Sequence, residues 1–144
     1  MVRIPGFVKR RRAAAAGLAC GLALLAGCES SPTNKDQDDR DAFLVEVVGE
    51  QFYVRATDPE TVAALEARQK SGEVSVVLGE VKQGDGGFNA PWSWHLDPAT
   101  VEVADAAMEL CDGRPSMVQK NVGKWIAEAR VYCPWSAKVV RAPK

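Results

Sequence analysis

The sequence contains few of the residues and motifs that most catalytic and metal sites need. Of its 144 residues, one is histidine and four are cysteine. The glycine-rich segment 84–87 is followed by neither a Lys-Ser nor a Lys-Thr pair, which argues against a phosphate-binding loop. No serine stands in a glycine-flanked nucleophile elbow. Asp36 and Asp38 do not begin a calcium loop, because Arg40 occupies a position that needs an oxygen ligand. The single histidine, His95, is therefore the residue around which a catalytic site would have to form.

The sequence also lacks an apolar run long enough for a membrane-spanning helix, which needs about 20 residues. The apolar run 13–26 ends short of that length, and it follows a basic patch with no acidic residue before Glu29. A basic start, an apolar stretch of this length and small residues before a cleavage site form the pattern of a secretory signal. We therefore expect residues 1–27 to be an export signal.

The end of this segment, Leu25-Ala26-Gly27-Cys28, resembles the lipobox of bacterial lipoproteins. The resemblance implies that Cys28 receives a diacylglyceryl group, becomes the new N-terminus and carries the acyl chains that anchor the protein. The alternative is an ordinary export signal with a chance cysteine at its cleavage site. Glu29 differs from the aspartate that retains such proteins at the inner membrane of enteric bacteria. The expected location is the cell envelope, with the outer membrane preferred, and the membrane is a partner through the lipid anchor.

Cleavage before Cys28 would change the charge of the chain. The signal carries five of the 18 basic residues and none of the 19 acidic ones, so 13 basic and 19 acidic residues remain, a formal charge of −6. Nucleic-acid affinity comes largely from Lys and Arg contacts to phosphate, so nucleic acid is not an expected partner. Residues 29–41 hold no large apolar side chain, and we expect 28–42 to be the lipidated terminus and a flexible tether. The remaining residues, 43–144, are enough for one compact domain.

Cys111 and Cys133 are the cysteines that remain once Cys20 leaves with the signal and Cys28 carries lipid. Two cysteines in an oxidising compartment indicate one disulfide. The alternative is a pair of metal-ligating thiolates, but a structural zinc site needs four ligands and His95 is the one nitrogen ligand available. We therefore predict the disulfide and no metal.

Hydrophobic periodicity and end signals predict a mixture of strands and helices. Alternation predicts a hairpin, and Asp58-Pro59 followed by Ser71-Gly72 predicts a helix from Pro59 to about Lys70. An apolar stripe after Pro115 predicts a second helix that contains Val118, Val122, Trp125, Ile126 and Ala129. The further strands are expected over 74–81, 92–96 and 132–140, with 83–91 as a loop and 101–111 extended or partly helical. The predicted fold class is α+β, a largely antiparallel sheet with two helices packed on it.

Three groups of residues carry a resemblance to a known family. They are the segment 91–98 with Asp105, the segment 108–112, and Cys133-Pro134-Trp135-Ser136. Together they resemble a family of small exported bacterial domains that is similar to the N-terminal domain of the slime-mould protein BP seventy-four. The resemblance covers about 43–140 and implies the fold, but it implies no catalytic residue and no cofactor. Some members carry a calmodulin-like label, which does not transfer to a chain without an EF-hand.

Two sets of residues are candidates for a functional site. His95 with Asp97, Asp105, Glu109 and Asp112 would form a metal or acid–base cluster if the fold brought them together, although a lone strand histidine more often makes structural hydrogen bonds. Trp92 and Trp94 would form an aromatic platform for a ligand, although tryptophans two apart on a strand more often belong to the core. Because a strand alternates its faces, His95 is expected opposite the tryptophans, covered and hydrogen-bonded.

These observations favour a membrane-anchored binding module over an enzyme. The expected ligand is an envelope protein or a glycan, with no cofactor. The alternative is a hydrolase or a metal-dependent enzyme centred on His95 and Asp97 or another nearby carboxylate. An enzyme would need His95 in a cleft within hydrogen-bond reach of a carboxylate, whereas a binding module needs an exposed aromatic or polar patch.

Overall fold

The computed structural model describes residues 41–144. The expected export signal, Cys28 and nearly all of the expected tether lie outside the described residues. Within the described part, no helix is long and apolar enough to cross a membrane.

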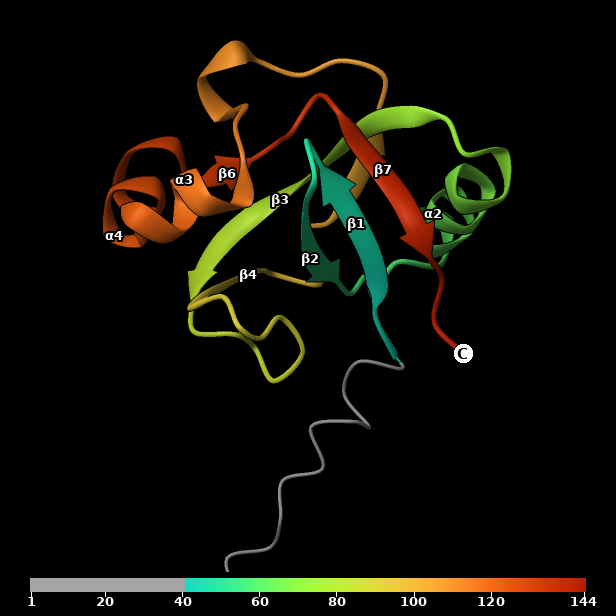
Figure 1. Cartoon of the computed structure of the whole chain (residues 1–144), viewed down its shortest axis with the longest axis horizontal. Helices are drawn as coiled ribbons and strands as arrows, with labels where there is room; N and C mark the ends of the chain where they lie inside the picture. Colours follow the sequence, from blue (N-terminus) through green and yellow to red (C-terminus); the bar gives the residue numbers. More distant parts are fainter. Residues whose placement is uncertain (1–40) are drawn as a thin grey trace, which may run out of the picture. The chain divides into compact units, whose positions relative to one another are not determined.

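A hairpin and the last strand of the chain form one side of the sheet (Figure 1). Strands β1 (Phe43–Val47) and β2 (Glu50–Val54) pair antiparallel, which confirms the predicted hairpin. The turn residues Val48 and Gly49 both have positive φ, 50° and 81°, as the tight turns of hairpins require. Strand β7 (Ala137–Arg141) pairs with the other edge of β1, so the sheet order is β2-β1-β7-β3-β4.

Strand β3 (Val74–Gln83) is the longest strand that the structure describes, and it pairs along both edges. One edge holds β4 (Trp94–Leu96) and β5 (Glu102–Ala104), and the other holds β6 (Val131–Tyr132) and β7. All these pairings are antiparallel. Most of its side chains on both faces are buried or half-buried, so β3 is the central covered strand that its apolar sequence predicts.

Helix α2 (Pro59–Ser71) begins and ends where the sequence predicts. The Asp58 carboxylate accepts a hydrogen bond from the Thr61 backbone N–H at 2.8 Å, and Pro59 occupies the first turn. Gly72 ends the helix in the left-handed region, with φ 70°, and its N–H donates to the Arg68 carbonyl at 2.9 Å. Leu65 is the buried anchor of this helix.

The predicted second helix is wrong as a single helix. Three short segments replace it, namely α3 (Pro115–Lys120), α4 (Val122–Lys124) and the π-helical turn η3 (Trp125–Ala129). Asn121 leaves the helical region with φ −144°, and the Arg130 N–H closes the wide turn on the Trp125 carbonyl at 2.7 Å. The fold is therefore a curled antiparallel sheet with a few short helices, α+β in broad terms rather than a sheet with two full helices.

Three further predicted segments are shorter or interrupted. The expected strand 92–96 begins at Trp94, and the expected strand 132–140 is divided into β6 and β7 by a turn over 133–136. The segment 101–111 contains β5, a loop and the short 3₁₀ turn η2 (Glu109–Cys111). The predicted loop is confirmed as irregular and extends over 84–93.

The core is aromatic at its centre. Phe52, Trp94 and Tyr132 are almost fully buried and surround one another, with ring centroids 5.5 to 5.7 Å apart. Gly79 lies beside this core, where a Cβ would come within 3.2 Å of Leu96 and 3.3 Å of Val101. A smaller apolar cluster forms around Val76 and the two cysteines, beneath the segment that precedes α3.

Candidate functional site

His95 lies on the face of β4 opposite the buried Trp94 and Leu96. Its Nδ1 lies 2.8 Å from the Gly84 carbonyl oxygen, and because a carbonyl only accepts, Nδ1 carries the proton. The ring meets Phe88 edge to face, with centroids 5.6 Å apart. A Cβ on Gly86 would lie 2.8 Å from the His95 ring, so the glycine-rich loop packs directly against the imidazole. The histidine therefore holds this loop to the sheet.

Three of the four carboxylates proposed as partners of His95 interact elsewhere, and the fourth, Glu109, lies at the start of η2. Asp97 Oδ2 lies 3.6 Å from Lys82 Nζ, and Asp105 pairs with Arg68 at 3.0 Å. Asp112 accepts a hydrogen bond from the Trp135 backbone N–H at 3.0 Å. Over residues 41–144, no group of three or more His, Cys, Asp or Glu residues is placed to hold a metal ion. The structure thus does not bring the candidate acid–base cluster together.

Replacing His95 by alanine should lower the free energy of unfolding by about 1–2 kcal/mol, because the hydrogen bond to Gly84 and the contact with Phe88 are lost. His95→Asn is the matched variant, since an amide can still donate to the carbonyl and should recover part of the loss. Urea unfolding followed by circular dichroism measures both. Unchanged stability of His95→Ala together with lost turnover of a substrate would support the enzyme alternative instead.

The proposed aromatic platform is not available in the structure. Trp94 has 0% of its surface exposed, so its ring cannot face a ligand. Trp92 is half-buried, precedes the strand and donates its Nε1–H to the Gln51 carbonyl at 2.8 Å. Trp94 is therefore a core residue, and Trp92 packs against the core and bonds to the β2 backbone.

An apolar groove that the sequence analysis did not identify lies between η2 and the α3–η3 segment. Its volume is about 410 Å³. Leu110, 85% exposed, and Met117, 49% exposed, are its most accessible apolar residues, and Met108 nearby in sequence is 72% exposed. The groove is lined by Leu110, Met117, Lys120, Asn121, Lys124, Trp125, Glu128 and Ala129. We refer to this feature as the η2–η3 groove.

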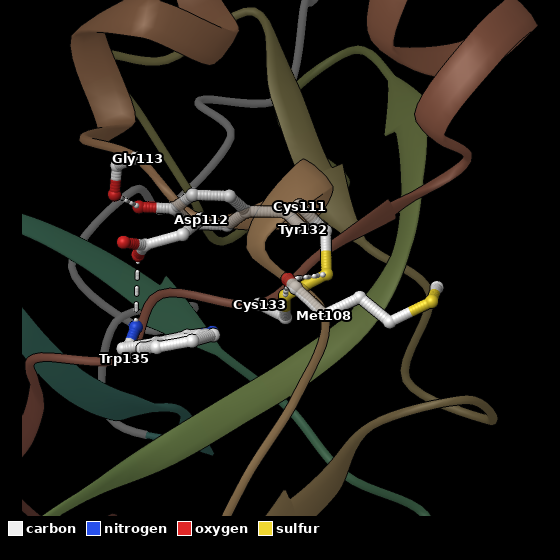
Figure 2. The surroundings of a disulfide bond; sticks show 7 residues. All are labelled: Met108, Cys111, Asp112, Gly113, Tyr132, Cys133 and Trp135. Atoms are coloured by element: carbon white, nitrogen blue, oxygen red, sulfur yellow. Dashed lines mark hydrogen bonds between the residues drawn. A yellow bond between two sulfur atoms is a disulfide. The ribbon is translucent and has the colours of Figure 1, made fainter.

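The disulfide between Cys111 and Cys133 is shown in Figure 2. Because Leu110 precedes Cys111 in sequence, the bridge fixes the Leu110 side of the groove. The predicted disulfide is thus confirmed, with the two Cα atoms 5.1 Å apart. The Cys133 N–H donates to the Cys111 carbonyl at 2.8 Å, and the Met108 carbonyl oxygen contacts both sulfurs at 3.2 and 3.4 Å. The Met108 side chain extends away from the bridge (Figure 2).

Tyr132 also helps to hold the segment that carries Leu110 against the sheet. Its hydroxyl donates to the Gly113 carbonyl at 2.9 Å, two residues after the end of the 3₁₀ turn. Burial, together with the negative charges of Asp112 and Glu50, raises the pKa of Tyr132, so the phenol stays protonated and remains a donor. Gly113 has φ 154°, a conformation that favours glycine, and the segment enters α3 immediately after it. Leu110 is therefore an exposed side chain on a firmly held backbone.

The groove wall opposite Leu110, formed by the α3–η3 segment, is held by contacts with the β1–β2 hairpin and with the core. The Glu50 carboxylate accepts hydrogen bonds from both the backbone N–H and the hydroxyl of Ser116, each at 2.8 Å, at the start of α3. Trp125, in the π turn, packs edge to face on Tyr132 with centroids 5.7 Å apart. A π turn within a helix is frequent at functional sites. The break at Asn121 and this turn together shape this wall of the groove.

Two lysines and one glutamate provide the charge of the η2–η3 groove. Lys124 pairs with Glu128 at 3.8 Å, one helical turn apart, and both side chains are 68% exposed. Lys120 forms no ion pair with any residue of the described part. Lys82 lies away from the groove. Its pKa is raised, mainly by the hydrogen bond that its Nζ donates to the Glu80 carboxylate. The groove therefore combines apolar walls with the positive charge of Lys120, which no ion pair of the described residues neutralises.

The sequence was compared with models of known protein families, with curated proteins and with solved structures. A family model described as the BP seventy-four N-terminal domain matches residues 39–144, which include the whole described domain. No match was found among curated proteins or among solved structures. The match extends over well more than half of the chain and agrees with the resemblance carried by the segments 91–98, 108–112 and 133–136. The chain therefore belongs to the family of the BP seventy-four N-terminal domain.

Proposed function

We propose that this protein is a lipid-anchored envelope protein whose domain binds a ligand or partner through the η2–η3 groove. The observation that carries the proposal is the exposure of Leu110, 85%, beside an apolar groove of about 410 Å³. A volume in this range is typical of ligand sites, which are mostly apolar with a few placed polar groups. Large apolar side chains on a held backbone are costly to leave in water unless another surface covers them.

Rigid backbone and adaptable side chains together suit recognition. The disulfide, the Tyr132 hydrogen bond and the Glu50 contacts to Ser116 hold the two walls. Walls that are already ordered lose little conformational entropy on binding. Met117 can adjust to the shape of a ligand because methionine is unbranched and polarisable. No comparable arrangement surrounds His95, whose imidazole is packed under the glycine-rich loop.

Leu110→Glu tests the groove. In a pull-down from envelope extract, this variant should retain at most about a tenth of the captured ligand or partner, because a charge would replace the exposed apolar anchor. Val74→Glu is the matched control, since Val74 is also exposed, 58%, but lies at the start of β3 and does not line the groove. Both variants should keep the wild-type circular dichroism spectrum. Equal capture by wild type and Leu110→Glu would contradict the proposal.

Cys28→Ser tests the anchor. The wild-type protein should partition into detergent and carry added acyl mass, whereas the serine variant should be released from the membrane fraction, because serine provides no thiol for lipid attachment. Fractionation followed by intact mass measurement distinguishes the two. A serine variant that is still membrane-bound and cleaved at the same position would show that the lipobox interpretation is wrong.

A further inference from the structure

The η2–η3 groove has an uneven distribution of polarity. Its apolar surface comes from Leu110 on one wall and from Met117, Trp125 and Ala129 on the other. Its positive groups, Lys120 and Lys124, stand on the same helical wall. A ligand that matched both features would have an extended apolar part and one negatively charged end.

The charge of Lys120 is not neutralised within the described part of the chain, because none of its ion pairs includes this lysine. Lys124 is held by Glu128 at 3.8 Å in a pair whose two side chains are 68% exposed. Such exposed pairs are weak, so an incoming anion can replace Glu128 as the partner of Lys124. Both lysines line the groove, so both charges are available to an anionic group bound there.

Resting on the proposed binding role of this groove, we propose that its ligand is a free long-chain carboxylate, that is, a fatty acid. The acyl chain lies along Leu110, Met117 and Trp125, and the carboxylate lies between Lys120 and Lys124. The volume of about 410 Å³ suits one small molecule. A protein partner would need about 800 Å² of surface on each side, so the groove would be only one part of such an interface.

The test uses the mature chain with Cys28→Ser, so that no attached lipid competes, and dodecanoate below its micelle concentration as the probe. Calorimetric titration should show saturable binding of dodecanoate. Dodecyl maltoside, with the same chain and no charge, and butyrate, with the same charge and a short chain, should both bind at least tenfold more weakly. Added salt should weaken the binding of dodecanoate, because exposed charges are screened.

Charge variants give the decisive comparison. Lys120→Met keeps an apolar stem and should weaken dodecanoate binding about two- to fivefold. Glu128→Gln removes the competing carboxylate and should strengthen binding by about the same factor. Lys138→Met, a lysine on β7 that does not line the groove, should have no effect. A neutral apolar ligand would respond to none of the three substitutions.

Several results would overturn the fatty-acid proposal. They are the absence of dodecanoate binding, equal binding of dodecyl maltoside, and indifference to both Lys120→Met and Glu128→Gln. Co-sedimentation of the unlipidated chain with phosphatidylglycerol vesicles, without binding of monomeric dodecanoate, would instead indicate a bilayer surface. In each case, Leu110-dependent capture from envelope extract would still support the groove as a binding site, so the two proposals can fail separately.

Discussion

Trp94→Ala is expected to lower the free energy of unfolding by about 3–5 kcal/mol. The side chain is fully buried, and its ring packs against Phe52, Tyr132 and Trp92 with centroids 5.5, 5.5 and 6.2 Å away. Alanine would leave a cavity at the point where β4 closes over the hairpin. Because small domains have about 5–15 kcal/mol of stability in total, this loss should move the urea midpoint far below that of the wild type.

Trp94→Phe is the matched variant. The Trp94 Nε1–H has no hydrogen-bond acceptor within the described residues, so phenylalanine removes no hydrogen bond. Its cost should therefore stay well below that of alanine and come from lost volume alone. Urea unfolding of the two variants and the wild type measures the difference. A wild-type midpoint for Trp94→Ala would contradict the buried position of this residue and return it to the candidates for a ligand platform.

Removal of the disulfide is the second large effect. Replacing Cys111 and Cys133 together by alanine should lower the free energy of unfolding by about 3 kcal/mol, because the bridge joins residues separated by 22 positions and restricts the unfolded chain. It also releases the attachment of Leu110 to the sheet, so capture through the groove should fall as well. Leu110→Glu should show the loss of capture without the loss of stability.

Chemical reduction provides an independent check of that effect. Wild-type protein unfolded in urea with a reducing agent should show the same lowered midpoint as the double-alanine variant, since both lack the bridge. If reduction leaves the midpoint unchanged, Cys111 and Cys133 are not joined in the purified protein, and the rigid wall of the groove loses its main support.

Local signals predicted the parts of the fold that depend on neighbouring residues. The Asp58 cap, Pro59 at the first turn and Gly72 at the end determine α2 within the chain itself, and the structure confirms both boundaries. Alternation predicted the β1–β2 hairpin, and the apolar residues on both faces of 74–81 predicted the covered strand β3. The placement of His95 opposite Trp94 followed from the period of a strand and needed no tertiary information.

The parts of the fold that the sequence did not predict depend on tertiary packing. The apolar stripe from Val118 to Ala129 is compatible with an unbroken helix. The poor helix formers Asn121 and Gly123 do not by themselves predict where a helix is interrupted or that it widens at Trp125. The widened turn accompanies the contact of Trp125 with Tyr132, a residue of β6. The groove arises from that interruption, so it could not be read from periodicity alone.

Two residues carried a signal that points to the groove. Met117 lies outside the apolar stripe of its helix, and Leu110 lies between the acidic residues Glu109 and Asp112 in a segment of short irregular elements. Large apolar residues without an internal partner are candidates for an interface. The carboxylates near His95 in sequence suggested a site that the structure does not form. Closeness in sequence does not reveal that their partners are Arg68, Lys82 and the Trp135 backbone.

Photo-crosslinking in intact cells tests the central claim most directly. A photoreactive side chain at position 110, in the protein with its own export signal and Cys28, should give a defined crosslinked product in the membrane fraction. The same side chain at position 74, which is similarly exposed but does not line the groove, should give none. Defined crosslinks from position 74 and none from position 110 would contradict the assignment of the η2–η3 groove as the binding site.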